Sequence, residues 1–231
     1  MLYVLTNLFA VFGVIILFVI SLSLEKWTFK KLSIRIISIM GIMTALSVIL
    51  TNLISYNIPL MGNKIMLALG DWILFLNGMI FGPIAGIITA VATDSIGSVI
   101  NVGGGYHAGF MFDKSLLAIS GSFIFLMSTN KNWYFHVIWL YCIAFFIISF
   151  LLNSIWLYAS GWTDLVFINV IFKLIKFPIE IIIYPFFVIS SFSILKIIIQ
   201  KWTQDQIWCL RKGTIPNIIK INRFRREYIE G

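Results

Sequence analysis

Apolar residues occur along the chain in long uninterrupted stretches, and short polar stretches separate them. Seven apolar stretches can be drawn, at residues 2–24, 34–54, 65–81, 83–100, 108–128, 134–158 and 165–198. A helix rises about 1.5 Å per residue, so stretches of this length can cross the roughly 30 Å hydrocarbon core of a bilayer. The pattern therefore predicts an all-α membrane protein with seven transmembrane helices.

The third stretch is the weakest of these predictions, because it is short and has polar residues at its start. Asn63 and Lys64 precede it, and Gly70 and Asp71 interrupt it. One interpretation is that this span begins as a re-entrant segment. The turn that follows, Phe81-Gly82-Pro83, contains no polar side chain. It predicts two short transmembrane helices that meet at one membrane interface.

The first apolar stretch is predicted to be a retained transmembrane helix. A signal peptide has basic residues before its apolar run, whereas here the basic residues follow the run, at Lys26, Lys30, Lys31 and Arg35. Cytoplasmic loops are enriched in Lys and Arg, so this loop is predicted to be cytoplasmic. With seven spans, the basic segment after residue 198 lies on the same side. We therefore expect a multi-pass protein of the plasma membrane with a cytoplasmic C-terminus.

The composition agrees with a membrane protein and limits the classes of function. Apolar residues make up 60% of the chain, charged residues 11%, and the mean hydropathy is +1.00. Much of the net charge of +8 comes from the C-terminal tail. A basic segment after a transmembrane helix is typical of contact with anionic lipid rather than with nucleic acid. No Cys or His spacing resembles a metal site, and neither a metal nor a cofactor is predicted.

Ionisable residues at membrane depth are the best indication of a functional site, because each costs roughly 2.5–3.5 kcal/mol at the centre of a membrane helix. The candidates are Asp71, Asp94, Asp113, Lys114, Lys173, Lys176 and Glu180. The predicted topology brings several of them near the outer membrane interface, which indicates a pocket for a polar, partly anionic solute. The alternative is a set of structural ion pairs, for example between Asp94 and a lysine of the last span.

Aromatic residues alternate with these charged residues along the chain, at Trp72, Phe75, Tyr106, Phe110, Phe112, Trp156 and Trp162. A flat conjugated ligand could stack on some of them, and Trp at a helix end is equally expected as an interfacial anchor. His107 could donate a hydrogen bond to a ligand; a solvated loop histidine is the alternative. Gly103-Gly104-Gly105 lacks the Gly-Lys-Ser/Thr of a nucleotide-binding P-loop, so uphill transport would need an ion gradient or other subunits.

Several motifs occur together over about residues 34–198. They are Phe81-Gly82-Pro83 with Gly86, Asp94, the Gly-rich loop leading to Gly109-Phe110, and Leu-Asn-Ser-Ile-Trp at 152–156. With these motifs the chain resembles the substrate-binding S component of energy-coupling factor (ECF) vitamin transporters. It is most similar to the folate-specific branch, in Gly70, Gly78, Asn153, Trp156, and the two lysines before Pro178. It departs from the family pattern at Ala108, which replaces a Pro, and at residues 111–114, which replace a Thr-rich segment.

The resemblance implies a six-helix domain at 34–198 that captures a vitamin from outside, in the first instance folate. The N-terminal helix at 1–25 and a basic cytoplasmic tail at 199–231 are additions to that domain. The pterin ring would stack on an aromatic side chain, and the glutamate tail would face Lys173 or Lys176. The substrate-binding residues implied in this way are Asp71, Trp72, Tyr106, His107, Phe110, Asn153, Trp156, Lys173 and Lys176.

The resemblance also implies partners, namely a transmembrane coupling subunit and two ATPase subunits, and it implies that the chain is not an enzyme. Gly41 and Ala45 lie where S components contact the coupling subunit, and small residues at this spacing let membrane helices approach closely. Packing within the bundle is the alternative for this pair.

Three alternatives remain open for the function. One is an S component for another vitamin or precursor, such as hydroxymethylpyrimidine, pantothenate, a queuosine precursor or riboflavin. The second is an intramembrane enzyme that uses Asp71, Asp94 or Asp113 as acid–base groups. The third is an ion-coupled carrier that works without ATPase subunits.

Overall fold

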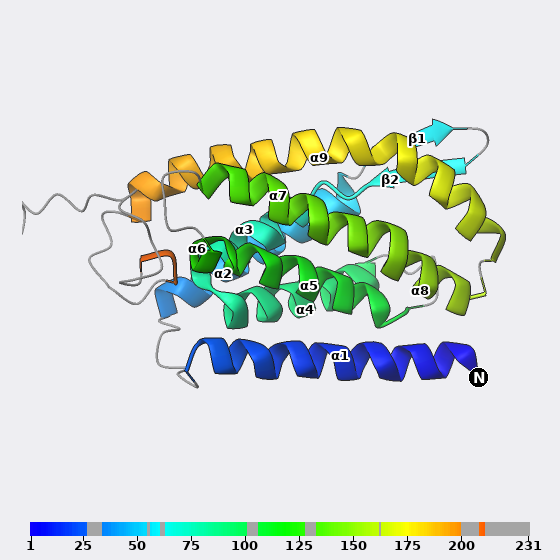
Figure 1. Cartoon of the computed structure of the whole chain (residues 1–231), viewed down its shortest axis with the longest axis horizontal. Coiled ribbons are helices and arrows are strands. Elements are labelled where there is room, and N and C mark those ends of the chain that lie inside the picture. Colours follow the sequence, from blue (N-terminus) through cyan, green and yellow to red (C-terminus); the bar gives the residue numbers. More distant parts are fainter. Residues whose placement is uncertain are drawn as a thin grey trace, which may run out of the picture.

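The computed structural model describes residues 1–26, 34–54, 56–60, 63–100, 106–127, 133–161, 163–199 and 208–210. Its helices run along one long axis, with α1 along one side of the bundle and α9 along the opposite side (Figure 1). The elements in chain order are α1 (Leu2–Leu24), α2 (Ile34–Val48), the π-helical turn η2 (Ile49–Leu53), β1 (Tyr56–Leu60), β2 (Asn63–Leu67), α3 (Asp71–Phe81), α4 (Pro83–Ile100), α5 (Gly109–Ser122), α6 (Ile124–Met127), α7 (Trp133–Phe146), the π-helical turn η3 (Ile147–Leu152), α8 (Asn153–Ala159), α9 (Thr163–Ile199) and the 3₁₀ turn η4 (Trp208–Leu210).

Six helical segments of the described chain are long and apolar enough to cross a membrane: Leu2–Leu24, Ile34–Leu53, Pro83–Ile100, Gly109–Met127, Trp133–Ala159 and Lys173–Leu195. Each overlaps a predicted span. Helix α3 occupies the remaining predicted position, but its 11 residues are too few to span a bilayer alone. The predicted helical fold, with a six-helix domain after one N-terminal helix, is confirmed.

The third predicted span starts later than expected. Strands β1 and β2 form an antiparallel hairpin, with Tyr56 opposite Leu67 and Leu60 opposite Asn63. The prediction that a span begins at residue 65 as a re-entrant segment is therefore wrong. The paired strands satisfy one another's backbone groups, and the helix begins only at Asp71, whose acidic side chain suits the first turn of a helix.

Helix α3 lies at the centre of the bundle. Every residue from Ile73 to Phe81 is buried, and α3 packs against α2, α4, α5 and α9. Its closest approach is to α5. A Cβ added at Gly78 would lie 1.7 Å from the carbonyl oxygen of Ala118, and one added at Gly121 would lie 2.0 Å from that of Phe75. The absence of side chains at the two glycines therefore lets the backbones of α3 and α5 touch.

The apolar turn between α3 and α4 forms as predicted. Gly82 has a φ of 104°, a left-handed conformation that side chains disfavour. Pro83 begins α4, where its missing N–H removes no helical hydrogen bond. The carboxylate of Glu25, just after α1, accepts a hydrogen bond from the N–H of Ile84 at 3.2 Å. The end of α1 is thus joined to the start of α4.

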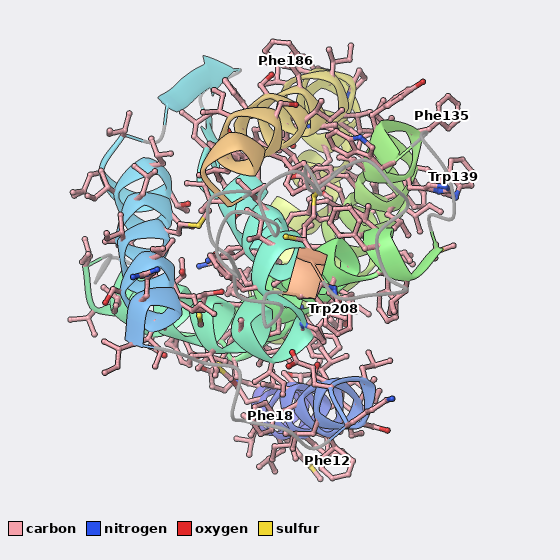
Figure 2. All side chains as sticks on the ribbon, turned by 90° about the vertical axis from the view of Figure 1, so that its left-hand side faces the viewer. Phe12, Phe18, Phe135, Trp139, Phe186 and Trp208 are labelled. Carbon is pink, nitrogen blue, oxygen red and sulfur yellow. The ribbon has the colours of Figure 1, made fainter. Side chains whose placement is uncertain are left out.

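Large apolar side chains cover the outside of the bundle, as expected for a surface in contact with lipid. Figure 2 shows Phe135, Trp139 and Phe186 pointing away from the bundle, with exposed fractions of 67%, 59% and 64%. Trp208 is instead only 2% exposed and donates a hydrogen bond to the carbonyl of Ser122 at 3.0 Å. Several regions named from the sequence lie outside the described residues: the Gly-rich loop at 101–105, Trp162, most of the loop at 26–35 and nearly all of the tail.

Candidate functional site

Trp156 is the centre of a buried polar group at the end of the bundle that contains the N-terminus. It belongs to α8, is 1% exposed, and donates a hydrogen bond from its Nε1 to Oδ1 of Asp113 on α5 at 3.0 Å. The second oxygen of Asp113, Oδ2, is buried and has no hydrogen-bond partner among the described residues. A buried carboxylate oxygen without a donor is costly, so this atom is suited to accept a hydrogen bond from a bound molecule.

His107 lies against Trp156. The two ring centroids are 5.3 Å apart and the rings are inclined by 30°. The N–H of Gly109 donates to Nδ1 of His107 at 2.9 Å, while Nε2 lies 3.0 Å from the hydroxyl oxygen of Thr6 on α1. Because Nδ1 accepts a hydrogen bond, the proton of the neutral ring belongs on Nε2. Burial lowers the pKa of His107 and favours this neutral form.

The lowered pKa of His107 predicts a dependence of stability on pH. The unfolded chain binds a proton at His107 more readily than the folded chain, so the free energy of unfolding should fall as the pH falls below about 6.5 and should be insensitive to His107 above it. The loss cannot exceed about 1.4 kcal/mol per pH unit for one group. Chemical unfolding in detergent between pH 5 and 8 measures it. Subtracting the pH profile of the His107→Gln variant from that of the unmutated chain removes the contribution of other groups. If the two profiles are identical, the lowered pKa of His107 is contradicted.

Phe110 and Tyr106 complete this end of the site. Phe110 packs against the apolar cluster around Trp156, and its ring meets the edge of His107 at a centroid distance of 6.3 Å. Tyr106 is 45% exposed, and its hydroxyl lies 3.9 Å from the sulfur of Met111. Partial burial of the phenol and the negative charge of Asp94 raise the pKa of Tyr106 to about 12. The phenol is therefore protonated at neutral pH.

Lys173 of α9 supplies a positive charge to the site. Its ammonium donates a hydrogen bond to the hydroxyl of Ser154 at 3.3 Å, and its charge acts on the Asp113 carboxylate. Within the described part of the chain Lys173 forms no ion pair. Asn153 begins α8 and is half-buried, one turn before Trp156. Side chains from α5, α8 and α9 thus meet around one buried carboxylate.

Three predicted site residues lie away from Trp156. Trp72 stacks on Phe187 of α9, with ring centroids 5.6 Å apart. Lys176 forms an ion pair with Glu180 at 2.9 Å, one turn along the same helix. Asp71 begins α3, where the charges of Lys114 and Lys176 act on its carboxylate. Of the three, Asp71 is linked to the group around Asp113, because its charge acts on the Asp113 carboxylate.

The alternative of structural ion pairs is correct in part. Asp94 of α4 pairs with Lys114 of α5 at 2.9 Å. The expectation that a lysine of the last span neutralises Asp94 is therefore wrong. Lys114 lies nearer because α4 and α5 pack directly against each other. The pair holds these two helices together.

Sequence reasoning did not place three residues in the site that the structure puts there. Asp113 was only one of several membrane-depth charges, and its contact with Trp156 joins residues 43 positions apart. Ser154 could have been noticed, because it stands between Asn153 and Trp156 in the motif at 152–156. Thr6 had no signal, since the N-terminal helix lies outside the region of resemblance.

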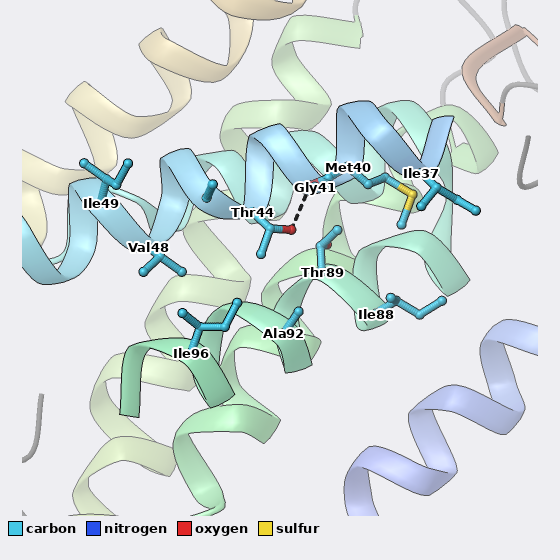
Figure 3. Close-up of a pocket in the computed structure, with 11 residues that line it drawn as sticks. Ile37, Met40, Gly41, Thr44, Val48, Ile49, Ile88, Thr89, Ala92 and Ile96 are labelled. Atoms are coloured by element: carbon cyan, nitrogen blue, oxygen red, sulfur yellow. Dashed lines mark hydrogen bonds between the residues drawn. The ribbon is translucent and has the colours of Figure 1, made fainter. Parts of the chain in front are cut away.

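A separate apolar groove of about 440 Å³ lies between α2 and α4. Gly41, Thr44 and Ala45 line it from α2, opposite Ile88, Thr89 and Ala92 of α4 (Figure 3). Thr44 keeps its hydroxyl bonded to the carbonyl of Met40 at 2.8 Å, so it presents little polarity to the groove. A Cβ added at Gly41 would meet no atom within 4 Å. The predicted small-residue pair therefore borders an open groove and does not serve to pack α2 against a neighbouring helix.

Comparisons with known proteins identify the fold and the family. The family model described as "ECF-type riboflavin transporter, S component" matches residues 31–193. Among solved structures, the "Crystal structure of FolT bound with folic acid" is similar, with a TM-score of 0.56 and 23% sequence identity, over 70% of this chain and 93% of that chain. No protein of curated function matches the chain.

The family match covers most of the chain and leaves out α1. The similar solved structure confirms the S-component fold that the motifs predicted. An S component is a subunit of a membrane transporter and not an enzyme, so the alternative of an intramembrane enzyme using Asp71, Asp94 or Asp113 is wrong. From the match over residues 31–193, the chain belongs to the family of ECF-type riboflavin transporter S components.

Proposed function

We propose that the chain binds a vitamin with a pteridine ring at the outer membrane surface, and that Trp156, His107 and Asp113 bind this ring. The observation that carries the proposal is the buried Asp113 oxygen that lacks a donor beside two aromatic rings. Pteridine rings are flat and conjugated, and they have N–H groups on one edge. Aromatic side chains contact such rings favourably, and hydrogen bonds to a carboxylate are about twice as strong as neutral ones.

The comparisons support this class of ligand. Folic acid, the ligand of the similar solved structure, contains a pteridine ring, and so does riboflavin, which the description of the family names. The pterin of folate offers two adjacent N–H donors to a carboxylate, and the isoalloxazine of riboflavin offers one. The two vitamins differ in the rest of the molecule, because folate has two carboxylates and riboflavin has an uncharged sugar-alcohol chain.

Within this class we propose folate, because Lys173 places an ammonium group beside the ring site that forms no ion pair with any described residue. A carboxylate of the glutamate tail would pair with it. Riboflavin is the second candidate, favoured by the family model. Mutation of Lys173 separates the two hypotheses, because only the folate hypothesis depends on its charge.

Lys173→Gln is expected to weaken folate binding about tenfold and to leave riboflavin binding within about twofold, because only folate loses a charge-assisted hydrogen bond worth about 1.5 kcal/mol. Glutamine can still donate to Ser154. Fluorescence titration or calorimetry gives both affinities. Lys176→Gln is the matched control, since Glu180 already holds that ammonium group. Equal losses in both variants would mean that the tail uses both lysines.

The first test of the proposed function is ligand-induced stabilisation of the purified chain in detergent. The panel contains folate, riboflavin, hydroxymethylpyrimidine, pantothenate and a queuosine precursor. A ligand at a hundredfold excess over its Kd should stabilise the folded state by about 2.7 kcal/mol. Stabilisation by folate or riboflavin alone supports the pteridine site. Stabilisation only by another vitamin would contradict that site while leaving the chain an S component.

We also propose that a transmembrane coupling subunit binds in the groove between α2 and α4, and that this coupling subunit is associated with two ATPase subunits. Gly41 and Ala45 leave room there for a helix of the partner. The proposal includes a cytoplasmic C-terminus in the plasma membrane, so the site around Trp156 faces outward. It is supported by the basic residues that follow the N-terminal helix and the last helix in the sequence, because cytoplasmic segments are enriched in Lys and Arg.

Gly41→Leu is expected to leave vitamin affinity unchanged and to weaken association with the coupling module about tenfold, because the leucine side chain fills the groove. Co-purification with co-expressed coupling and ATPase subunits measures the association. Ile42→Ala is a control on the lipid-facing side of α2, where Ile42 is 68% exposed. Vitamin uptake into liposomes by the chain alone would contradict the need for partners and would support an ion-coupled carrier.

A further inference from the structure

The first two turns of α1 are bonded to the segment that places His107. The side-chain oxygen of Asn7 accepts a hydrogen bond from the N–H of Ala108 at 2.8 Å. The hydroxyl of Thr6 lies 3.0 Å from Nε2 of His107, and the hydroxyl of Tyr3 donates to the carbonyl of Tyr106. Three consecutive residues of the segment before α5 are therefore bonded to one helix that stands about a hundred positions earlier in the sequence.

These hydrogen bonds have a single consistent direction. Nε2 of His107 carries the ring proton and donates to Thr6, because Nδ1 already accepts from Gly109. The hydroxyl of Thr6 is then free to donate to the carbonyl of Leu2 or of Tyr3, each 3.0 Å away. The amide nitrogen of Asn7 donates to the Tyr3 carbonyl at 2.9 Å, which turns the amide oxygen toward Ala108. The described hydrogen bonds are therefore compatible with one assignment of the protons.

Small residues bring the same face of α1 against the site. Ala10 is 1% exposed and forms one apolar cluster with Ala108 and Trp156. A Cβ added at Gly13 would lie 2.7 Å from the ring of Phe112. The N-terminal end of α1 and helix α8 lie at the same end of the bundle (Figure 1). Because the family match begins only at residue 31, these contacts come from outside the matched domain.

We propose that α1 is a built-in clamp of the ligand site, in which Thr6 and Asn7 are positioning residues that hold His107 against Trp156. The inference rests on the proposed function for the meaning of His107 and Trp156. If the segment were free, only a fraction of molecules would have His107 in place, and the apparent Kd would rise by the inverse of that fraction. The clamp therefore acts on affinity by pre-organising the site, without any contact between α1 and the vitamin.

The test uses the full chain with Thr6→Val and Asn7→Leu combined, which keeps the side-chain volumes and removes both hydrogen bonds. Two quantities are measured: hydrogen exchange of the Ala108 and Gly109 amides without ligand, and the Kd of folate and of riboflavin. We expect about tenfold faster exchange and about tenfold weaker binding, since one neutral hydrogen bond contributes up to roughly a factor of ten. Leu8→Ala is the control. Leu8 follows Asn7 directly and is 64% exposed, so its replacement should change neither quantity more than twofold.

The two measurements separate the clamp from the proposed function. If the double variant exchanges faster but the unmutated chain binds neither vitamin, the pteridine site is overturned, while the anchoring of residues 106–108 by α1 still holds. Unchanged exchange together with unchanged Kd would overturn the clamp, and faster exchange with unchanged Kd would reduce the contact to a structural one. Thr6→Val alone is the milder variant should the double variant fold poorly. Thr6→Ser keeps the hydroxyl group, so its exchange rates and its Kd values should equal those of the unmutated chain.

Discussion

Asp113→Asn is expected to weaken binding of the pteridine vitamin by about 10- to 100-fold. A hydrogen bond to a charged group contributes about 1.5–3 kcal/mol, and each 1.4 kcal/mol is a factor of ten. Asparagine has the same shape, and its oxygen can still accept from Nε1 of Trp156. Its amide nitrogen would then replace the buried Oδ2 atom and would present a donor to the N–H edge of the ring. Titration of folate and riboflavin, followed by tryptophan fluorescence, measures the change.

The stability of the ligand-free chain distinguishes a binding role of Asp113 from a structural one. Oδ2 has no donor in the described part of the structure, so the neutral asparagine should leave the free energy of unfolding unchanged or raise it. Asp94→Asn is the matched control. It breaks the ion pair with Lys114, so the free energy of unfolding should fall. A stability loss in Asp113→Asn with unchanged vitamin affinity would contradict the proposed site.

The helices could be predicted from the sequence because a membrane helix needs only a long apolar stretch, and the six long spans have one. The β-hairpin could not be predicted in this way. Residues 65–69, which include the end of β2, are all apolar, so the apolar pattern begins before the true start of α3 at Asp71. What separates strand from helix here is pairing between two short segments, and hydropathy does not report pairing.

The site was predictable in its residue types but not in its pairings. Lys173 and Lys176 share a helix face, yet Lys173 acts on Asp113 whereas Lys176 pairs with Glu180. The neutralisation of Lys176 could have been read from the sequence, since Glu180 stands four residues later, the spacing of a helical ion pair. The contact between Trp156 and Asp113 could not, because it depends on how α5 and α8 pack. The role of α1 could not be predicted either, because its contacts with His107 and Ala108 also depend on helix packing.

Gly78→Ala is expected to lower the free energy of unfolding by about 3 kcal/mol, near the upper end for an overpacked core. The added Cβ would lie 1.7 Å from the carbonyl oxygen of Ala118. That oxygen belongs to the backbone of α5, so no side chain can rotate away and the two helices must separate. The shift of α5 would also move Asp113, which it carries. Thermal unfolding in detergent should show a decrease of roughly 6–12 °C for a chain of this size.

Gly41→Ala makes the same chemical change at a position where a Cβ meets no atom within 4 Å. It should leave stability unchanged or raise it by up to about 1 kcal/mol, because alanine has the higher helix propensity. The difference between the two variants isolates the contact of α3 with α5 from propensity, which is common to both. Equal melting points would mean that the helices separate at little cost, and the close approach at Gly78 would then not hold the centre of the bundle together.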